Sequence, residues 1–357
     1  MTREEEIEKV HGNGCHVVIL GAGASLACTL RSPEKSGRKL PLMKNVIEVV
    51  GLTKIVDGLP DHIKAHRENF EKFYSEISKD AKFNSERQYI EEKVYAYFNT
   101  LDLPDTPTIY DYLVLALRYR RDVIATFNWD PFLYKAYVRN GEFVKSPGIL
   151  HLHGCVSLGY DKSNGSAGPA GWYSKATEQR FEPTRLLYPV EKKDYNSDPF
   201  IKGQWDALAE ELKIAERVTV FGYSAPVTDV EAIELLQKAW GKAEERAMEQ
   251  FELIDIREES EVRKSWNTFI HSHHYNYCKD YFKSSFAYHP RRTVESYHHW
   301  SMPMSPSDSF QDGNPVPADF RSLEELWGWH KPLIEAEEEF YGSSYAKMHQ
   351  ELMKQIK

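Results

Sequence analysis

Short apolar runs that end at a glycine or a polar residue recur along the chain. Residues 16–20 and 123–127 are largely apolar, and residues 148–152 repeat this with His151 as an interruption. Residues 218–221 and 251–256 are further short runs, the second of them interrupted by Glu252 and Asp255. Continuous apolar runs of this length are typical of strands that are buried on both faces, as in a parallel sheet. The pattern therefore predicts five strands of one sheet.

Segments with helical spacing separate these runs. Apolar residues recur at steps of three and four over 69–80, 88–98, 109–119 and 201–215. We therefore expect a helical insertion between about residues 60 and 120. Strands that alternate with helices predict an α/β fold, with a Rossmann-like parallel sheet and helices on both faces.

Three further segments show other patterns. Residues 156–171 are rich in Gly and Ser, which predicts a mobile loop. Residues 301–318 carry four prolines among Ser and Asp, which predicts a linker or a surface arm. Ser322 and Glu325 fit a capping box, so a C-terminal helix should begin there.

Composition and charge narrow the class of protein. The chain has 357 residues, which suits two domains or one large domain with insertions. Its 45 Lys and Arg and 54 Asp and Glu give a formal net charge of −9, so no direct nucleic-acid partner is expected. The first six residues are charged, and no apolar run approaches the ~20 residues of a membrane helix. We therefore expect a cytoplasmic protein with no membrane partner.

Cysteine and histidine positions indicate that no metal is bound. Cys15, Cys28, Cys155 and Cys278 form no C-x-x-C pair, and disulfides are rare in cytosolic proteins. A histidine-rich tail permits a metal site near Cys278, but no ligand pattern closes a tetrahedral site. These histidines are His271, His273, His274, His289, His298 and His299.

The first strand ends in the small residues Gly21-Ala22-Gly23-Ala24-Ser25. Backbone N–H groups at such a turn, together with the helix dipole, favour a pyrophosphate. The dinucleotide fingerprint G-x-G-x-x-G is incomplete because Leu26 takes its third glycine position. A tight turn without a ligand is the alternative.

Polar residues also follow the second and third strands. Ligands bind at the carboxyl ends of strands in doubly wound sheets. Asn128 could bond a ribose hydroxyl or hold a water, and Asp130 could orient this loop or contact the ribose; an Asx turn is the alternative. His153 could act as a general base, although a structural role is the commoner one for a lone histidine. His151 competes with it for that role.

The fourth and fifth strands end in further candidates. Gly222 and Ser224 could donate hydrogen bonds to a phosphate or a ribose, and Asp255 could accept from the adenosine ribose. Plain turn or surface roles are the alternatives. Asp229 is a plausible N-cap of the next helix.

The four strand-end motifs are more specific together than each is alone. In chain order the strand ends carry Gly-Ala-Gly-Ala-Ser, Thr-x-Asn-x-Asp, His-Gly and Gly-x-Ser. With these motifs the sequence resembles the sirtuin-like superfamily, in the form of the zinc-free bacterial sirtuin-like NAD hydrolases. The likeness covers about residues 14–256 and includes Leu187-Tyr188-Pro189, Lys192 and Trp205. It implies a catalytic domain over 1–256 and a C-terminal extension over 257–357.

The resemblance also implies roles for single residues. Asn128, Asp130 and His153 would be catalytic and face the nicotinamide ribose. The residues that bind NAD would be Gly21, Ala22, Gly23, Ser25, Gly222, Ser224 and Asp255. The chain departs from the protein deacylases because it lacks their four-cysteine zinc module and carries Trp129 where they have a smaller aliphatic residue.

The activity implied by the resemblance is hydrolysis of NAD to nicotinamide and ADP-ribose, in a regulated bacterial anti-phage defence effector. NAD is then the substrate, and the cleavage passes through an oxocarbenium-like transition state. Two alternatives stay open. One is an NAD-dependent deacylase or ADP-ribosyltransferase, and the other is a non-catalytic NAD or ADP-ribose sensor that acts through a partner.

The C-terminal extension is expected to mediate assembly. Its aromatic residues Trp327, Trp329, Phe340 and Tyr341 would suit packing on another chain, in a homo-oligomer or with a partner protein of a defence system. Assembly could order the loop over 156–171 and so control activity. The alternative is that these aromatics cover an edge of the chain's own sheet.

Overall fold

Six parallel strands form the centre of the molecule. The computed structural model describes residues 14–30, 38–174, 177–190, 195–225, 229–246, 249–271, 275–297 and 314–355, with the side chains of the last helix described up to residue 339. The strand order is β3-β2-β1-β7-β8-β9, and each neighbouring pair runs parallel. The strands are β1 (Cys15–Leu20), β2 (Val123–Thr126), β3 (Gly148–His151), β7 (Ala215–Phe221), β8 (Gln250–Ile254) and β9 (Tyr275–Cys278).

Strand β1 shows why the apolar runs are continuous. Val17 and Ile19 pack into one hydrophobic core, while Val18 and Leu20 pack into a second core on the other face of the sheet. Because successive strand residues point to opposite faces, a strand between two helical layers needs apolar residues at every position. The expected Rossmann-like α/β fold is thereby confirmed.

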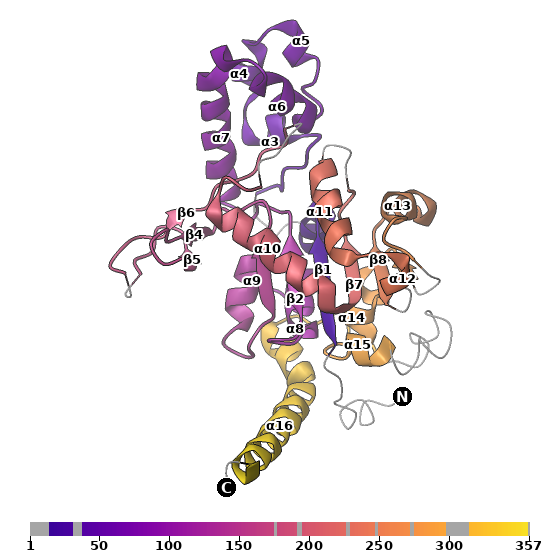
Figure 1. Ribbon diagram of the computed structural model, residues 1–357. Coiled ribbons are helices and arrows are strands. Elements are labelled where there is room, and N and C mark those ends of the chain that lie inside the picture. Colours follow the sequence, from indigo (N-terminus) through magenta and orange to yellow (C-terminus); the bar gives the residue numbers. More distant parts are fainter. Residues whose placement is uncertain are drawn as a thin grey trace.

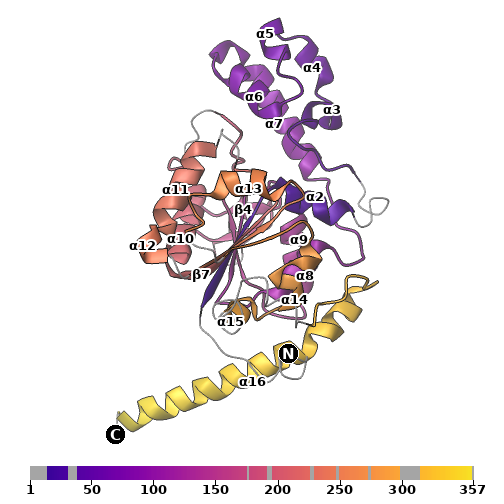
Figure 2. The same cartoon turned by 90° about the vertical axis from the view of Figure 1, so that its right-hand side faces the viewer.

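Helices cover both faces of the sheet (Figure 2). One layer contains α2 (Ala22–Leu30), α8 (Ile109–Ala116), α9 (Phe132–Asn140) and α14 (Ser285–Tyr288). The opposite layer contains α10 (Pro199–Ile214), α11 (Val230–Trp240) and α13 (Glu259–Trp266). The short helix α12 (Ala243–Arg246) has no buried residue, whereas α15 (Thr293–Ser296) is buried at every position and contacts β1.

A helical lobe projects from one end of the sheet (Figure 1). It contains α3 (Val46–Val50), α4 (Thr53–Asp57), α5 (Asp61–Lys64), α6 (Phe70–Ser78), the 3₁₀ turn η1 (Ala81–Phe83) and α7 (Asn84–Phe98). The lobe begins earlier than the expected residue 60, because its first helices are too short to show helical spacing. It also ends at Phe98. Helix α8 is buried at every position and belongs to the layer against the sheet.

The segment expected to be a mobile loop contains a small antiparallel sheet. Strands β4 (Leu158–Tyr160), β5 (Ala167–Pro169) and β6 (Glu182–Pro183) form it in the order β5-β4-β6. Glycines are required here because Phe181 lies on the hairpin. A Cβ atom at Gly159 or Gly168 would approach Phe181 to 2.6 or 2.5 Å.

The sheet and the last helix extend beyond residue 256, where the sequence placed the end of the catalytic domain. Strand β9 pairs with β8, and α16 (Leu323–Gln355) begins directly after Ser322, where a helix start was expected, although Glu325 accepts from Arg321 and not from Ser322 as a capping box requires. There the Glu325 amide donates to Ser322 Oγ at 3.3 Å, and the Arg321 amide donates to Glu325 Oε2 at 2.8 Å. From this start α16 runs away from the sheet (Figures 1 and 2).

The described aromatic residues of α16 pack on their own chain. Trp327 Nε1 donates to Asn140 Oδ1 at 2.8 Å, and the Trp327 ring stacks on Phe143 with centroids 5.4 Å apart. Trp329 packs against the same hydrophobic core. Part of the surface of these two residues is therefore covered by the chain itself. The side chains of Phe340 and Tyr341 lie outside the described residues.

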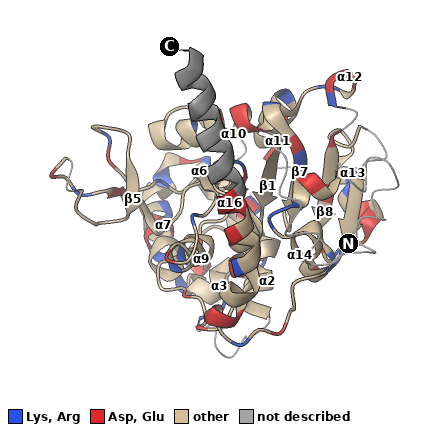
Figure 3. Cartoon of the chain, turned by 90° about the horizontal axis from the view of Figure 1, so that it is seen from below, with Lys and Arg blue, Asp and Glu red and all other residues tan. Residues whose placement is uncertain are grey.

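Buried ion pairs attach α16 to the body of the molecule. Arg118 Nη1 and Arg121 Nη1 donate to Glu295 Oε1 at 2.7 and 2.9 Å. Arg291 Nε donates to Glu337 Oε2 at 2.7 Å, and Arg118 also contacts Glu337. Figure 3 views the molecule from below, and basic and acidic residues are interspersed along the described segments.

The described residues contain four buried free thiols and no metal cluster. Cys15, Cys28, Cys155 and Cys278 are all reduced. Within the described ranges, no group of three or more His, Cys, Asp or Glu side chains could hold a metal ion. The tail histidines at 273, 274, 298 and 299 lie outside those ranges. Also within them, no helix is both long and apolar enough to cross a bilayer.

Candidate active site

The carboxyl ends of four strands surround one cavity of about 150 Å³. Gly21 follows β1 and Gly222 follows β7, and these two neighbouring strands lie where the order of the sheet reverses. Ligands of doubly wound sheets bind at such a switch point. Eight of the ten predicted site residues line the cavity, namely Gly21, Ala22, Ser25, Asn128, Asp130, His153, Gly222 and Ser224.

Two predicted residues lie outside the lining of the cavity. Asp255 follows β8 and forms an ion pair with Arg257, with Nη2 and Oδ2 2.7 Å apart. Gly23 lies in the first turn of α2, behind Gly21. The lining thus gathers the residues from β1, β2, β3 and β7, while the acidic residue at the end of β8 has a cationic partner of its own.

The glycines at the end of β1 allow two backbone segments to pack closely. Gly21 N–H donates to Phe221 O at 3.0 Å, and Gly23 N–H donates to Gly222 O at 2.9 Å. A Cβ atom on Gly23 would lie 2.7 Å from the Cα of Gly222, which itself has a φ of +61°. These two amides therefore donate within the protein, whereas the sequence placed them on the phosphates of NAD.

The amide of Asn128 is held in one orientation by the end of β1. Its Nδ2 donates to Gly21 O at 2.8 Å and to Ser25 Oγ at 2.9 Å, and lies 3.2 Å from Tyr110 Oη. Because Nδ2 is engaged with the protein, Oδ1 is the atom of this side chain that can accept from a water or a ribose hydroxyl. Sequence reasoning missed Tyr110, since it lies within an apolar helical pattern.

Asp130 is a buried carboxylic acid with a shifted pKa. Burial raises the pKa of Asp130 from 3.8 to about 6, although hydrogen bonds from Ser25 and from the Phe132 amide lower it in part. The Phe132 amide donates to Asp130 Oδ1 at 3.1 Å at the start of α9, as in the predicted Asx turn. Asp130 therefore combines a raised pKa with a place in the lining of the cavity.

His153 lies in the cavity, and His151 does not line it. His153 Nε2 is 3.4 Å from Tyr195 Oη, and the edge of the ring meets Phe127 with centroids 4.8 Å apart. Gly154 has a φ of +79°, and a Cβ atom there would lie 2.1 Å from Arg185 O, so glycine must follow this histidine.

The neighbouring histidine is buried beside α10. The backbone amide of His151 donates to Gln204 Oε1 at 2.9 Å. Burial lowers the pKa of His151 to about 4, so its ring is neutral at physiological pH. Of the two competing histidines, only His153 is therefore placed to contact a ligand in the cavity.

Two residues after β7 form one wall of the cavity. Tyr223 Oη donates to Asp229 Oδ2 at 2.8 Å, and the Tyr223 ring stacks on Phe127 with centroids 4.1 Å apart. Asp229 was expected to cap α11, but its side chain makes no hydrogen bond to the first turn of that helix. It faces the cavity instead.

The helical lobe closes the cavity from the other side. Glu71 and Phe98 come from α6 and α7, and Leu40, Pro41 and Met43 come from the segment before α3. Pockets that hold drug-sized ligands usually measure about 300–1,000 Å³, so this cavity accommodates only part of a dinucleotide. Sequence reasoning missed these lobe residues, because no local motif links them to the strand ends.

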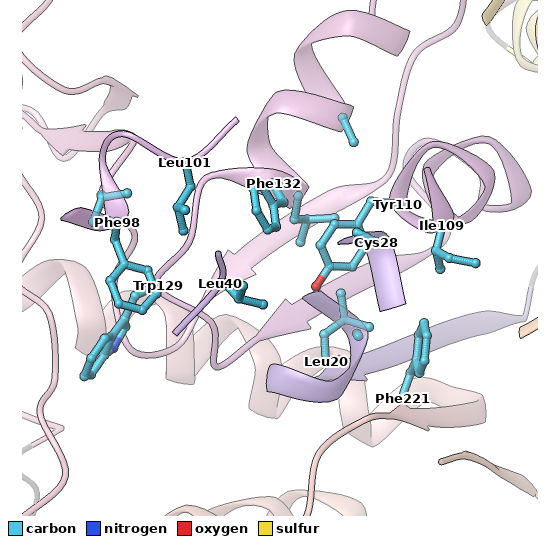
Figure 4. Close-up of a cluster of buried hydrophobic side chains, with 14 of the residues drawn as sticks. Leu20, Cys28, Leu40, Phe98, Leu101, Ile109, Tyr110, Trp129, Phe132 and Phe221 are labelled. Atoms are coloured by element: carbon cyan, nitrogen blue, oxygen red, sulfur yellow. The ribbon is translucent and has the colours of Figure 1, made fainter. Parts of the chain in front are cut away.

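Trp129 forms the boundary between the lobe and the sheet. Its ring meets Phe98 edge to face with centroids 5.8 Å apart (Figure 4). It also lies 4.8 Å from the ring of Tyr188. The Trp129 carbonyl accepts from the Val156 amide at 3.0 Å. The Trp129 side chain is thus packed against Phe98 and Tyr188, while its backbone is held by Val156.

Solved structures of Sir2 proteins are similar to this chain. A complex of a Sir2 homologue with NAD is 14% identical with a TM-score of 0.38, and the alignment covers 78% of this chain and 88% of that one. A Sir2 bound to an acetylated peptide is 14% identical with a TM-score of 0.35, covering 79% and 94%. A Sir2 with a p53 peptide and NAD is 13% identical with a TM-score of 0.35, covering 78% and 92%. No family model and no curated protein matches the chain.

Proposed function

We propose that this protein is an NAD hydrolase that releases nicotinamide and ADP-ribose. One observation carries the proposal. Asn128, Asp130 and His153, which the sequence motifs single out on two separate strand ends, line the same cavity at the switch point of the sheet. An amide, a carboxyl group and an imidazole around one small cavity are groups that can position and activate a water molecule.

The proposed reaction breaks the bond between the anomeric carbon of the ribose and the nicotinamide nitrogen. Nicotinamide leaves with the bonding electron pair, and the ribose carries positive charge in the oxocarbenium-like transition state. The oxygen of a water molecule then bonds to the anomeric carbon and loses a proton. The products are nicotinamide, ADP-ribose and one proton.

Two residues have direct roles in this proposal. Asn128 Oδ1 accepts from the attacking water, because Nδ2 is held by Gly21 O and Ser25 Oγ. His153 polarises or deprotonates either that water or a ribose hydroxyl. Asp130, whose burial favours the neutral acid, is stabilised as an anion when positive charge develops on the ribose.

The proposal includes a biological setting that follows from the motif resemblance. Uncontrolled NAD cleavage in the cytoplasm would be toxic, so the activity would be regulated in a bacterial anti-phage effector. Assembly into a homo-oligomer, or binding of a partner protein of the defence system, would provide this control. The small volume of the cavity, beside which the lobe residue Phe98 packs against Trp129, supports a low activity of the isolated chain.

Mass spectrometry of NAD incubated with the purified protein tests the proposal. We expect free ADP-ribose and nicotinamide in equal amounts, and no product from Asn128→Ala. ADP-ribose attached to a protein or to an acyl group would instead support the transferase or the deacylase. NAD that is bound but remains intact, also with added partner and at high protein concentration, would support the sensor.

A further inference from the structure

A second cavity, of about 700 Å³, lies at the other end of the sheet from the candidate active site. Its lining comes from the start of β1, from the segments before β2 and β3, from the end of α10 and from α16. In Figure 1 the helical lobe and α16 project from opposite ends of the molecule. Pockets that bind small ligands usually measure about 300–1,000 Å³, so the second cavity has room for a nucleotide.

The two cavities differ in charge. Among the described residues, the lining of the active-site cavity has the carboxyl groups of Glu71, Asp130 and Asp229 and no Lys or Arg. The second cavity is lined by five cationic side chains and three carboxylates. The cationic residues are Arg118, Arg120, Arg121, Lys145 and Arg291. A polyphosphate is therefore repelled by the first cavity and attracted to the second.

Three of these cations are neutralised by carboxylates of the protein. Arg118 and Arg121 pair with Glu295, and Arg291 pairs with Glu337. The other two are available to a ligand.

The available cations gather around one aromatic ring. Arg120 and Lys145 form no ion pair within the described ranges, and lie over the ring of Tyr119 at 5.2 and 5.7 Å from its centroid. A tyrosine ring attracts cations but does not cancel their charge. The two like charges therefore repel each other, and an anion bound between them would remove this repulsion.

The backbone of Arg120 is held in an unusual conformation. Its φ is +61°, a value that is uncommon and strained for a residue with a Cβ atom. Asp122 closes the turn around it, because Asp122 Oδ2 accepts from the Arg118 amide at 2.8 Å. Arg291, in the same lining, has a φ of +66°. Strain of this kind is concentrated at sites that bind ligands, so it supports a binding role for this cavity.

We propose that the second cavity binds the di- or triphosphate group of a nucleotide, or inorganic polyphosphate, between Arg120 and Lys145. Guanidinium and ammonium groups donate charge-assisted hydrogen bonds to phosphate oxygens. The ring of Tyr119 keeps the two cations close together before the ligand arrives. This site is separate from the proposed hydrolase site and does not depend on its activity.

Calorimetric titration of the full chain with ATP, inorganic triphosphate and adenosine tests the proposal. Magnesium is left out so that the phosphate charges stay available. We expect saturable binding of ATP and none of adenosine. Tighter binding of ATP than of triphosphate would identify a nucleotide as the ligand, whereas equal binding would identify inorganic polyphosphate. If neither anion binds saturably, or if adenosine binds as tightly as ATP, the proposal is wrong.

Variants show whether the anion binds in this cavity. Arg120→Gly removes one cation and permits the positive φ without strain, so its thermal stability without ligand should change little. We expect it to bind ATP about 10–100-fold more weakly, as suits the loss of a charged donor. Lys145→Ala should have a similar effect. The control Lys54→Ala removes an exposed lysine of α4 and should leave the affinity for ATP unchanged.

The measured affinities and NAD cleavage together separate this proposal from the proposed function. Equal affinity for ATP in the wild type, Arg120→Gly and Lys145→Ala would overturn the site and leave the hydrolase intact. A wild type that binds ATP through these two residues but does not cleave NAD would overturn the hydrolase alone.

Discussion

The two histidines near the end of β3 differ in position although only one residue separates them. His153 lines the cavity beside Phe127, and His151 is buried against α10 with a pKa lowered to about 4. Residues two apart on a strand point to the same face, so the sequence made them competitors. Strand β3 ends at His151, so the alternation of a strand no longer applies to His153. The turn at Gly154 instead determines where His153 lies.

Substitution of each histidine should therefore have a different result. We expect His153→Ala to lower kcat for NAD cleavage by about 10²–10⁴-fold, the usual contribution of a general acid or base. His151→Ala should retain most of the activity and lose mainly stability. Both variants are compared by product formation and by thermal unfolding. A larger loss of kcat in His151→Ala would contradict the assignment.

Asp130 gives a prediction about pH because its pKa is raised to about 6 in the folded state. The folded protein keeps this proton to a higher pH than the unfolded chain does, so stability falls as pH rises from about 4 through 6. We expect Asp130→Asn to raise the free energy of unfolding at pH 8 by about 1–3 kcal/mol, and by about half as much at pH 5. Urea titrations at both pH values measure this, and an equal gain at each would count against the prediction.

At the scale of single residues, the sequence predicted those that belong to local motifs. Asn128 and His153 were found because each follows an apolar run and precedes a turn. Glu71, which lines the cavity, and Tyr110, which contacts Asn128, were missed because they come from helices far away in the sequence. Their proximity depends on how the helical layers pack, and no local spacing encodes it.

At the scale of elements, the helix α16 is attached by charges that sequence reasoning did not connect. Glu337 contacts Arg118 and Arg291, and all three side chains are buried. Breaking a buried ion pair by removing one partner leaves the other charge uncompensated. The sequence left open whether this region mediates assembly or covers the chain's own sheet, and the ion pairs attach its helix to the rest of the fold.

We expect Glu337→Gln to lower the free energy of unfolding by about 3 kcal/mol, as suits a broken buried pair. Glu335→Gln is the control on the same helix. Glu335 pairs with Lys331 at 3.7 Å on the surface, so the change in stability should stay below about 1 kcal/mol. Denaturant unfolding of both variants checks this. Equal stability of the two would show that the ion pairs contribute nothing to the attachment of α16.

Long elements with well-defined buried faces were predicted from the sequence, whereas short elements and edge strands were missed. The long amphipathic pattern of α10 and the apolar run of β1 were found near their observed limits, since burial on defined faces leaves a clear period. Helices α3 and α4 were missed because each has only five residues. Strand β9 was missed because it alternates aromatic and polar residues at the edge of the sheet.

At the scale of the whole molecule, activity should depend on assembly. A chain that ends after residue 339 keeps the buried residues Leu326, Leu333 and Glu337 and should therefore fold. We expect the full chain to cleave NAD faster per subunit as its concentration rises, and the shortened chain to show a low and constant rate. Light scattering and rate measurements on the same samples test this. A high rate per subunit at the lowest concentration would rule out control by assembly.

The burial of all four cysteines has a practical consequence. Alkylating reagents attack the thiolate, and burial raises the pKa of Cys155 to about 12 and that of Cys278 well above its ordinary value. The thiols are distributed over β1, α2, the turn after β3, and β9. Maleimide labelling of the native protein therefore reports how often these parts of the fold open, with no introduced probe. A dinucleotide that binds only the folded chain would slow this labelling, and so reveal its own binding without any turnover.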